Sequence, residues 1–286
     1  MSVGRFIQPA SREELLDALL WMDEDSHIVA GCTDFLAERN GKSYQANTLV
    51  SLARMEELRH IEKKGNALVI GAMCTHAQIA KHPLVQGYFP ALSKACASVG
   101  SMQIRNRATI GGNIVNASPA GDTIICAMLY GAQAVLLNAR GEERALPVEE
   151  FITGIGKTAL LRDEMLSRLV FPISSPPKNS CFFKLGSRQQ VTISRLTLAS
   201  SFEKYADGSL ANVRLLLGSI AAKPVLFERV GEYLQDPATR SFEAFSDAVS
   251  QKVGETMGTR RTRPYKEEAV RGLAYDFYTY AINEPV

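Results

Sequence analysis

The sequence has no surplus of one charge, no long apolar run and no leader-like start. Its 32 Lys and Arg residues nearly balance 30 Asp and Glu residues, and a net charge of +2 does not indicate a nucleic-acid surface. The basic cluster at residues 260–263 is typical of a solvated face, although a partner contact stays open. No stretch is apolar enough to span a bilayer, and residues 1–9 lack a signal-peptide pattern. We therefore expect no nucleic acid, no membrane and a cytoplasmic location.

Closely spaced metal-ligand pairs are also missing. The five cysteines lie far apart, unlike the ligands of a zinc site or an iron–sulfur cluster. Their odd number argues against a disulfide framework, so buried, reduced thiols are expected. The four histidines fall on different predicted elements, and no acid–base or nucleophilic constellation is convincing. We predict that this chain holds no metal and supplies no catalytic residue of its own.

What the sequence does contain is an alternation of apolar strands and capped helices. With 286 residues, 46% of them hydrophobic, the chain is long enough to bury a large core. Short apolar runs predict strands, and capping boxes or N-terminal prolines predict helices. The expected strands in the first part are 27–30, 48–52, 67–71, 134–138 and 165–171. The expected helices there are 11–20, 34–39, 75–82, 90–97 and 124–130.

A proline-rich stretch, residues 172–178, is the best boundary in the chain. Its three prolines and two serines cannot continue a helix or a central strand. Beyond it, apolar runs at 181–185, 196–205 and 213–218 predict an antiparallel sheet, and helical patterns follow at 241–255 and 265–280. The sequence therefore predicts an α/β part followed by an α+β part.

Two short glycine-containing segments, residues 30–34 and 109–113, carry the strongest functional signal. A tight loop that leads into a helix offers free backbone N–H groups to an anion, and the helix dipole favours negative charge there. Glycine lets the backbone approach a phosphate without an intervening Cβ. Alone, each segment is equally well explained as a tight turn. Together, they predict a dinucleotide that is held from two sides.

The same segments resemble a known family. Residues 30–36, 109–122 and 183–188 are similar to the FAD-binding medium subunit of molybdenum hydroxylases, the family of the xanthine dehydrogenase, aldehyde oxidoreductase and carbon monoxide dehydrogenase flavoproteins. The fourteen residues from Thr109 to Asp122 follow the family's order and are the most specific part. The resemblance extends over nearly the whole chain.

The resemblance implies a mixed α+β and α/β fold that is not of the Rossmann type. A two-lobed FAD-binding domain of the PCMH (vanillyl-alcohol-oxidase-like) type would occupy residues 1–175, with lobes at about 1–56 and 57–175. A C-terminal antiparallel sheet with helices, like that of the carbon monoxide dehydrogenase flavoproteins, would occupy residues 178–286.

Backbone amides and short polar side chains are the expected pyrophosphate ligands. Gly31, Gly111 and Gly112 are the firmest assignments, whereas Thr33 and Thr109 can add hydroxyl donors. The full set of implied cofactor contacts is Val29, Ala30, Gly31, Cys32, Thr33, Asp34, Phe35, Val99, Thr109, Ile110, Gly111, Gly112, Asn113, Ser118, Asp122, Leu166 and Lys184.

Several of these residues have simpler alternative roles. The resemblance implies that Asp122 bonds the ribitol or ribose hydroxyls, but it can also be the N-cap of the following helix. The resemblance places the Leu166 backbone and the Lys184 side chain near the flavin ring, where a cation stabilises the negatively charged reduced form. Lys184 can instead be an exposed strand lysine, and Val99 can be ordinary core.

Cys32 departs from the family, which usually has glycine at this position. If the position requires a positive φ angle, a cysteine is strained there by roughly 1 kcal/mol. Weaker FAD binding, use of the backbone N–H alone and a reactive thiol are the three interpretations that the sequence leaves open.

The resemblance also implies a role in a larger enzyme. A large molybdopterin subunit would hydroxylate the substrate, and a small subunit with two 2Fe-2S clusters would deliver electrons to the FAD of this chain. NAD or another acceptor would then take them. Two alternatives stay open: a stand-alone flavin oxidase of the same broad fold, which needs its own catalytic base, and a scaffold that binds no flavin.

Overall fold

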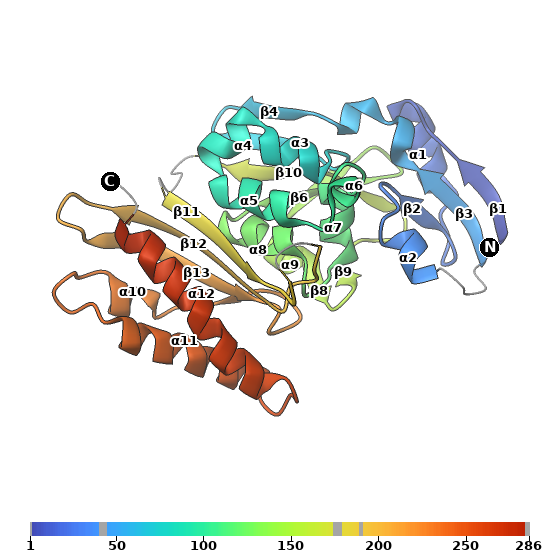
Figure 1. Ribbon diagram of the computed structural model, residues 1–286. Helices are drawn as coiled ribbons and strands as arrows, with labels where there is room; N and C mark the ends of the chain where they lie inside the picture. Colours follow the sequence, from blue (N-terminus) through green and yellow to red (C-terminus); the bar gives the residue numbers. More distant parts are fainter. Residues whose placement is uncertain (1, 40–44, 174–178, 189–190, 284–286) are drawn as a thin grey trace.

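The computed structural model describes residues 2–39, 45–173, 179–188 and 191–283. Their strands form sheets of three, five, four and two strands (Figure 1). The strands are β1 Ser2–Ile7, β2 His27–Val29, β3 Gln45–Ser51, β4 Ile61–Lys64, β5 Ala67–Gly71, β6 Gln133–Asn138, β7 Glu143–Pro147, β8 Ile152–Gly154, β9 Lys157–Thr158, β10 Glu164–Pro172, β11 Asn179–Leu185, β12 Leu196–Lys204, β13 Leu210–Gly218 and β14 Val225–Leu226.

Twelve α-helices lie within the same described ranges, and two short 3₁₀ helices follow β3. The α-helices are α1 Arg12–Leu20, α2 Phe35–Arg39, α3 His76–Lys81, α4 Pro83–Tyr88, α5 Pro90–Ser98, α6 Met102–Arg105, α7 Ile110–Asn116, α8 Asp122–Leu129, α9 Val148–Phe151, α10 Val230–Leu234, α11 Phe242–Met257 and α12 Arg263–Asn283. The 3₁₀ helices are η1 Leu52–Arg54 and η2 Glu56–Leu58.

The N-terminal sheet is parallel and small. Its order is β1-β3-β2, and β3 pairs in parallel with both neighbours. Leu15 and Leu19 of α1 are buried in a cluster with Met55 and Met165, which joins this sheet to the central one. The sequence predicted β2 and β3 but missed β1, because residues 2–7 form no continuous apolar run.

The central sheet is antiparallel, with the order β4-β5-β10-β6-β7. The largest hydrophobic cluster joins its strands to α3, α4, α5, α7 and α8. Leu68, Ile70 and Leu169 are completely buried in this cluster. These helices lie on one side of the central sheet, and α5 and α8 among them also contact the C-terminal sheet (Figure 1).

The C-terminal sheet, β11-β12-β13-β14, has a helical layer on each face. Strand side chains alternate between the two faces. Leu196, Leu198 and Phe202 of β12 pack into a cluster with α10, α11 and α12. Ala199 between them joins Phe182 in the central cluster, beside α5 and α8. The same alternation directs Lys184, two residues after Phe182, toward α8.

Most of the predicted strands and helices are confirmed to within a few residues. One detail was wrong: the segment 109–113 is the start of helix α7 rather than a loop. The helix predicted at 75–82 does end before Pro83, and Pro83 begins a further helix, α4. Residues 40–44, which follow the predicted helix 34–39, and most of the proline-rich stretch, 174–178, lie outside the described residues. The three larger sheets follow one another along the chain, and the domain bounds stay a prediction.

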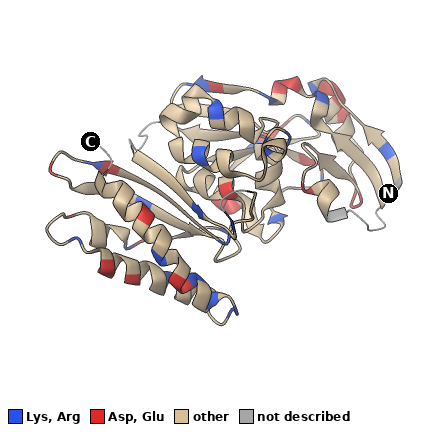
Figure 2. Cartoon of the chain, in the orientation of Figure 1, with Lys and Arg blue, Asp and Glu red and all other residues tan. Residues whose placement is uncertain are grey.

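Charged side chains of both signs are interspersed over the elements visible in Figure 2. Among the described helices, none combines the length and apolar character needed to cross a membrane. The described residues include no group of three or more His, Cys, Asp or Glu side chains placed to hold a metal ion. All five cysteines are free thiols, and Cys32 alone among them is not buried.

Candidate functional site

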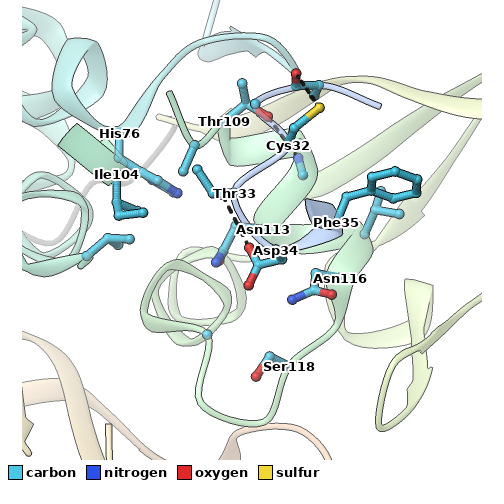
Figure 3. A pocket seen from close by; sticks show the side chains of 18 of the residues that line it. Cys32, Thr33, Asp34, Phe35, His76, Ile104, Thr109, Asn113, Asn116 and Ser118 are labelled. Carbon is cyan, nitrogen blue, oxygen red and sulfur yellow. Dashed lines mark hydrogen bonds between the residues drawn. The ribbon is translucent and has the colours of Figure 1, made fainter. Parts of the chain in front are cut away.

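A cavity of about 660 Å³ lies where the end of β2, the start of α7, the end of β11 and residues 191–194 meet. Its size is typical of sites for organic cofactors. Sixteen of the seventeen predicted contact residues line it, and Figure 3 shows several of them from close by. The exception is Ile110, whose side chain is completely buried in the central core and whose N–H donates to Cys74 O at 3.0 Å. Ile110 therefore does not line the cavity, and its contact with the cofactor stays a prediction.

The first glycine segment forms a turn between β2 and the short helix α2. The backbone N–H groups of residues 31–34 donate to no atom among the described residues. Gly31 is required by packing, because an added Cβ would lie 2.1 Å from Arg107 O. Gly31 therefore lets this turn approach the chain just before α7. Residues 31–34 line the cavity, so their unpaired N–H groups are candidate donors for an anion there.

Cys32 adopts the left-handed conformation in which a cysteine is strained, with φ +61°. Its thiol donates weakly to Ala30 O at 3.6 Å. Burial raises the pKa of the Cys32 thiol, and nearby Arg107 lowers it by less. A raised pKa disfavours the thiolate, so the reactive-thiol interpretation has no support here.

Because glycine has no Cβ strain at positive φ, Cys32→Gly is expected to stabilise the protein by about 0.5–1 kcal/mol. Cys32→Ala is the matched control, since it removes the thiol but keeps the strain. Thermal unfolding of the three proteins measures the effect. A Cys32→Gly protein less stable than Cys32→Ala would contradict a strain at this position.

The second glycine segment is the first turn of α7. Thr109 is its N-cap, and its hydroxyl accepts a hydrogen bond from Gly112 N at 3.1 Å. Gly111 is also required by packing, because an added Cβ would lie 2.6 Å from Ala72 Cβ. Gly112 is exposed and would meet only Thr109 Oγ1, at 3.1 Å. Of the three predicted glycines, Gly112 alone is open toward a ligand rather than pressed against the protein backbone.

Asn113 is oriented by a neighbouring helix. Its side-chain oxygen accepts a hydrogen bond from Thr123 Oγ1 at 2.6 Å, so its amide nitrogen is left to point into the cavity (Figure 3). This nitrogen has no acceptor among the described residues. Thr33 and Ser118 also line the cavity, and each adds a hydroxyl group. The lining thus offers several donors that suit phosphate oxygens.

A buried ion pair also lines the cavity. Lys184 Nζ donates to Asp122 Oδ2 at 2.6 Å, and the two side chains are only 12% and 5% exposed. Ser194 and Ser98 donate to the same carboxylate, at 2.5 Å and 3.3 Å. Burial raises the pKa of Asp122, whereas Lys184 and the two hydroxyl groups oppose this shift.

These contacts decide two of the alternatives left open by the sequence. Asp122 is the first residue of α8, Gly121 is the N-cap and no side chain caps this helix, so the N-cap interpretation of Asp122 was wrong. The exposed-lysine interpretation of Lys184 was also wrong. Leu166 and Val99 both line the cavity, and Leu166 lies where the pairing of β10 with β6 shifts register.

Sequence reasoning missed other parts of the lining. The most important are His76, Ile104 and the segment 191–194, which join the cavity only through long-range packing. The capping box at Thr75 is a sequence signal for the start of α3, but nothing in the sequence shows that the next residue, His76, is completely buried at the cavity. Neither ring nitrogen of His76 has a hydrogen-bond partner among the described residues.

Burial, and to a smaller degree Arg105, lowers the pKa of His76 from 6.5 to about 4. The unfolded chain therefore takes up a proton near pH 6.5 that the folded chain accepts only near pH 4, and stability is lost as the pH falls through this range. Relative to His76→Leu, the protein is expected to lose about 2 kcal/mol of unfolding free energy between pH 7 and pH 4.5. Urea unfolding at several pH values tests this, and parallel pH curves for both proteins would contradict it.

The fold and the cavity define a mixed α/β protein with an organic-cofactor site lined by free backbone donors. The family model described as "FAD binding domain in molybdopterin dehydrogenase" matches residues 2–174. The chain therefore belongs to this family, as the resemblance indicated, and FAD is its cofactor.

Relatives cover nearly the full length of the chain. It is 30% identical over 274 residues to the nicotinate dehydrogenase FAD-subunit of Eubacterium barkeri, with 94% of this chain and 92% of the relative covered. It is 28% identical over 270 residues to the xanthine dehydrogenase FAD-binding subunit of Escherichia coli O157:H7, with 92% and 91% covered.

Solved structures share the fold. A chain of quinoline 2-oxidoreductase from Pseudomonas putida 86 superposes with a TM-score of 0.86 at 22% identity, with 97% of this chain and 96% of that chain covered. A chain of carbon monoxide dehydrogenase from Hydrogenophaga pseudoflava gives 0.82 at 23% identity, with 95% and 94% covered. The mixed α/β fold predicted from the sequence is confirmed.

Proposed function

We propose that this chain is the flavin subunit of a molybdenum-containing hydroxylase or dehydrogenase. It takes electrons from iron–sulfur clusters of a partner subunit and passes them to NAD or another acceptor. One observation carries this proposal: residues 30–34 and 109–113, about 80 residues apart in the chain, line the same cavity. The N–H groups of residues 31–34 there have no partner among the described residues. The family match supports the cofactor, and the cavity supports its location.

The residues present fit FAD. The free N–H groups of residues 31–34 and the side-chain amide of Asn113 would hold the pyrophosphate, and Gly112 would let it approach α7 without an intervening Cβ. The Lys184–Asp122 pair lines the cavity beside β11, and the flavin ring and the ribityl chain would lie near it. FAD supplies the redox chemistry when bound, and the protein supplies position and electrostatics. The fixed cation of Lys184 favours added negative charge nearby.

The organisation in two lobes is part of this proposal. Residues 1–56 and 57–175 would form the lobes of a PCMH-type domain, with FAD between them, and residues 178–286 the C-terminal domain. The cavity supports this arrangement, because its lining comes from the end of β2 in the first range and from α7 and β10 in the second.

The proposed partners are a large molybdopterin subunit and a small iron–sulfur subunit. Relatives carry names such as "Carbon monoxide dehydrogenase medium chain" from Hydrogenophaga pseudoflava and "Nicotine 6-hydroxylase medium subunit" from Paenarthrobacter nicotinovorans, which supports a complex. The names span different substrates, so we assign substrate choice to the large subunit. A cytoplasmic location agrees with free thiols such as Cys74 and Cys96.

Purification of a tagged chain from its own cells tests the assembly. The expected result is co-purification of two further subunits, with molybdenum and iron present beside the flavin, and no hydroxylation by the isolated chain. A flavin-loaded chain that oxidises a substrate alone, without molybdenum or iron, would instead identify a stand-alone oxidase.

A further inference from the structure

His76 combines complete burial with two unsatisfied ring nitrogens. It is the first residue of α3, and its backbone N–H donates to Ala108 O at 3.1 Å, which ties the start of this helix to the chain before α7. Its side chain is 0% exposed, and neither Nδ1 nor Nε2 has a partner among the described residues. Buried polar groups in native proteins are nearly always hydrogen-bonded, so an unpaired imidazole at a cavity wall indicates a missing partner.

The cavity is the place from which this partner can come. His76 lines it together with Thr33, Ile104 and Asn113, and in Figure 3 a ring nitrogen points toward Thr33 and Asn113. This is the part of the lining that carries the unpaired N–H groups of residues 31–34. The imidazole is thus aimed at the region proposed above for the pyrophosphate and its neighbours.

The chemistry of the ring suits this region. Because its pKa is low, His76 is neutral near pH 7 and has one N–H donor and one acceptor nitrogen. Phosphate oxygens accept hydrogen bonds, and ribose or ribityl hydroxyls both donate and accept. A neutral imidazole can therefore bond the cofactor without bringing a second cation beside Lys184.

We propose that His76 is a further FAD-binding residue, whose ring nitrogens find in the dinucleotide the hydrogen-bond partner that they lack in the protein. This inference rests on the proposed location of FAD. The nitrogens are closed to water in the structure, so a rotation of the His76 ring or of the neighbouring cavity residue Ile104 accompanies binding. Such rotamer changes are common when ligands bind.

Titration of the flavin-free protein with FAD, followed by flavin fluorescence, tests the proposal. His76→Leu removes both nitrogens at similar volume and is expected to weaken FAD binding about 5- to 10-fold, as for one lost hydrogen bond. The melting temperature of the flavin-free variant should be unchanged or higher, because no protein hydrogen bond is lost. His76→Gln, which keeps a donor and an acceptor, should recover part of the affinity.

His82→Leu is the matched control. His82 follows the last residue of α3 and also has a buried Nδ1 without a partner, but it does not line the cavity. Its substitution should leave FAD affinity unchanged. If His76→Leu does not fold, NMR of the wild-type protein provides a second test. The ¹⁵N chemical shifts of the His76 ring should change when FAD binds.

The outcomes separate this proposal from the proposed function. FAD binding by the wild-type protein, with equal affinity for His76→Leu or with unchanged ring shifts, overturns the role of His76 alone. Failure of the wild-type protein to bind FAD overturns the proposed function itself.

Discussion

Replacing Lys184 with methionine is expected to destabilise the flavin-free protein by about 3 kcal/mol, because Asp122 would remain buried without its counter-charge. Burial already raises the pKa of Asp122, and loss of Lys184 removes the largest opposing influence. A buried acid with a raised pKa costs stability above its unfolded pKa, near 3.9, and not below it. The loss in Lys184→Met should therefore be largest at neutral pH and shrink toward pH 4.

Two further variants test whether the loss comes from the unpaired buried charge of Asp122. The double variant Lys184→Met/Asp122→Asn should recover most of the lost stability, since neither side chain is then left charged and buried. Lys252→Met is the matched control, because Lys252 pairs with Glu228, which is 63% exposed, and should cost less than about 1 kcal/mol. Urea unfolding measures all four proteins. Equal losses for Lys184→Met and Lys252→Met would show that the buried pair does not stabilise the fold.

Replacing Gly112 with alanine is expected to weaken FAD binding by about tenfold to a hundredfold while leaving the flavin-free protein intact. An added Cβ would meet only Thr109 Oγ1, at 3.1 Å, and alanine favours the helix by about 1 kcal/mol over glycine. The methyl group would instead occupy space that we assign to the pyrophosphate. Fluorescence titration and thermal unfolding of the variant measure the two effects.

Gly111→Ala provides the contrast for this experiment. Its Cβ would lie 2.6 Å from Ala72 Cβ and 2.7 Å from Ala72 O, so this variant should lose about 1–3 kcal/mol of stability before any ligand is added. Unchanged FAD affinity in a folded Gly112→Ala protein would mean that the cofactor does not approach α7 at this point.

The sequence predicted the elements whose signal is local. Apolar runs identified β5, β6 and β10, and capping patterns identified α1 and α3, because burial and end-capping are decided by neighbouring residues. β1 was missed, since its residues become a strand through parallel pairing with β3, some 40 residues further along the chain. Pairing over such a distance leaves no local pattern.

In the candidate site, too, only the features with a local signal were predictable from the sequence. Residues 30–34 and 109–113 could be singled out because glycine next to a predicted helix is a local signal, and the family resemblance joined them. The physical role of two glycines was not predictable: Gly31 packs against Arg107 and Gly111 against Ala72. The ion pair of Lys184 with Asp122 joins β11 to the start of α8, and the His76 N–H bonds the chain just before α7. These contacts between segments far apart in the chain, and the burial of His76, are visible only in the structure.

The central claim is that the two glycine segments form a single FAD site, and an absorption spectrum tests it most directly. The purified chain is incubated with excess FAD, freed of unbound flavin and measured in the visible range. We predict flavin bands that correspond to one FAD per chain and that are lost or much reduced in Gly112→Ala at the same FAD concentration. A wild-type protein without flavin bands after this reconstitution would contradict the account and identify the chain as a scaffold that binds no flavin.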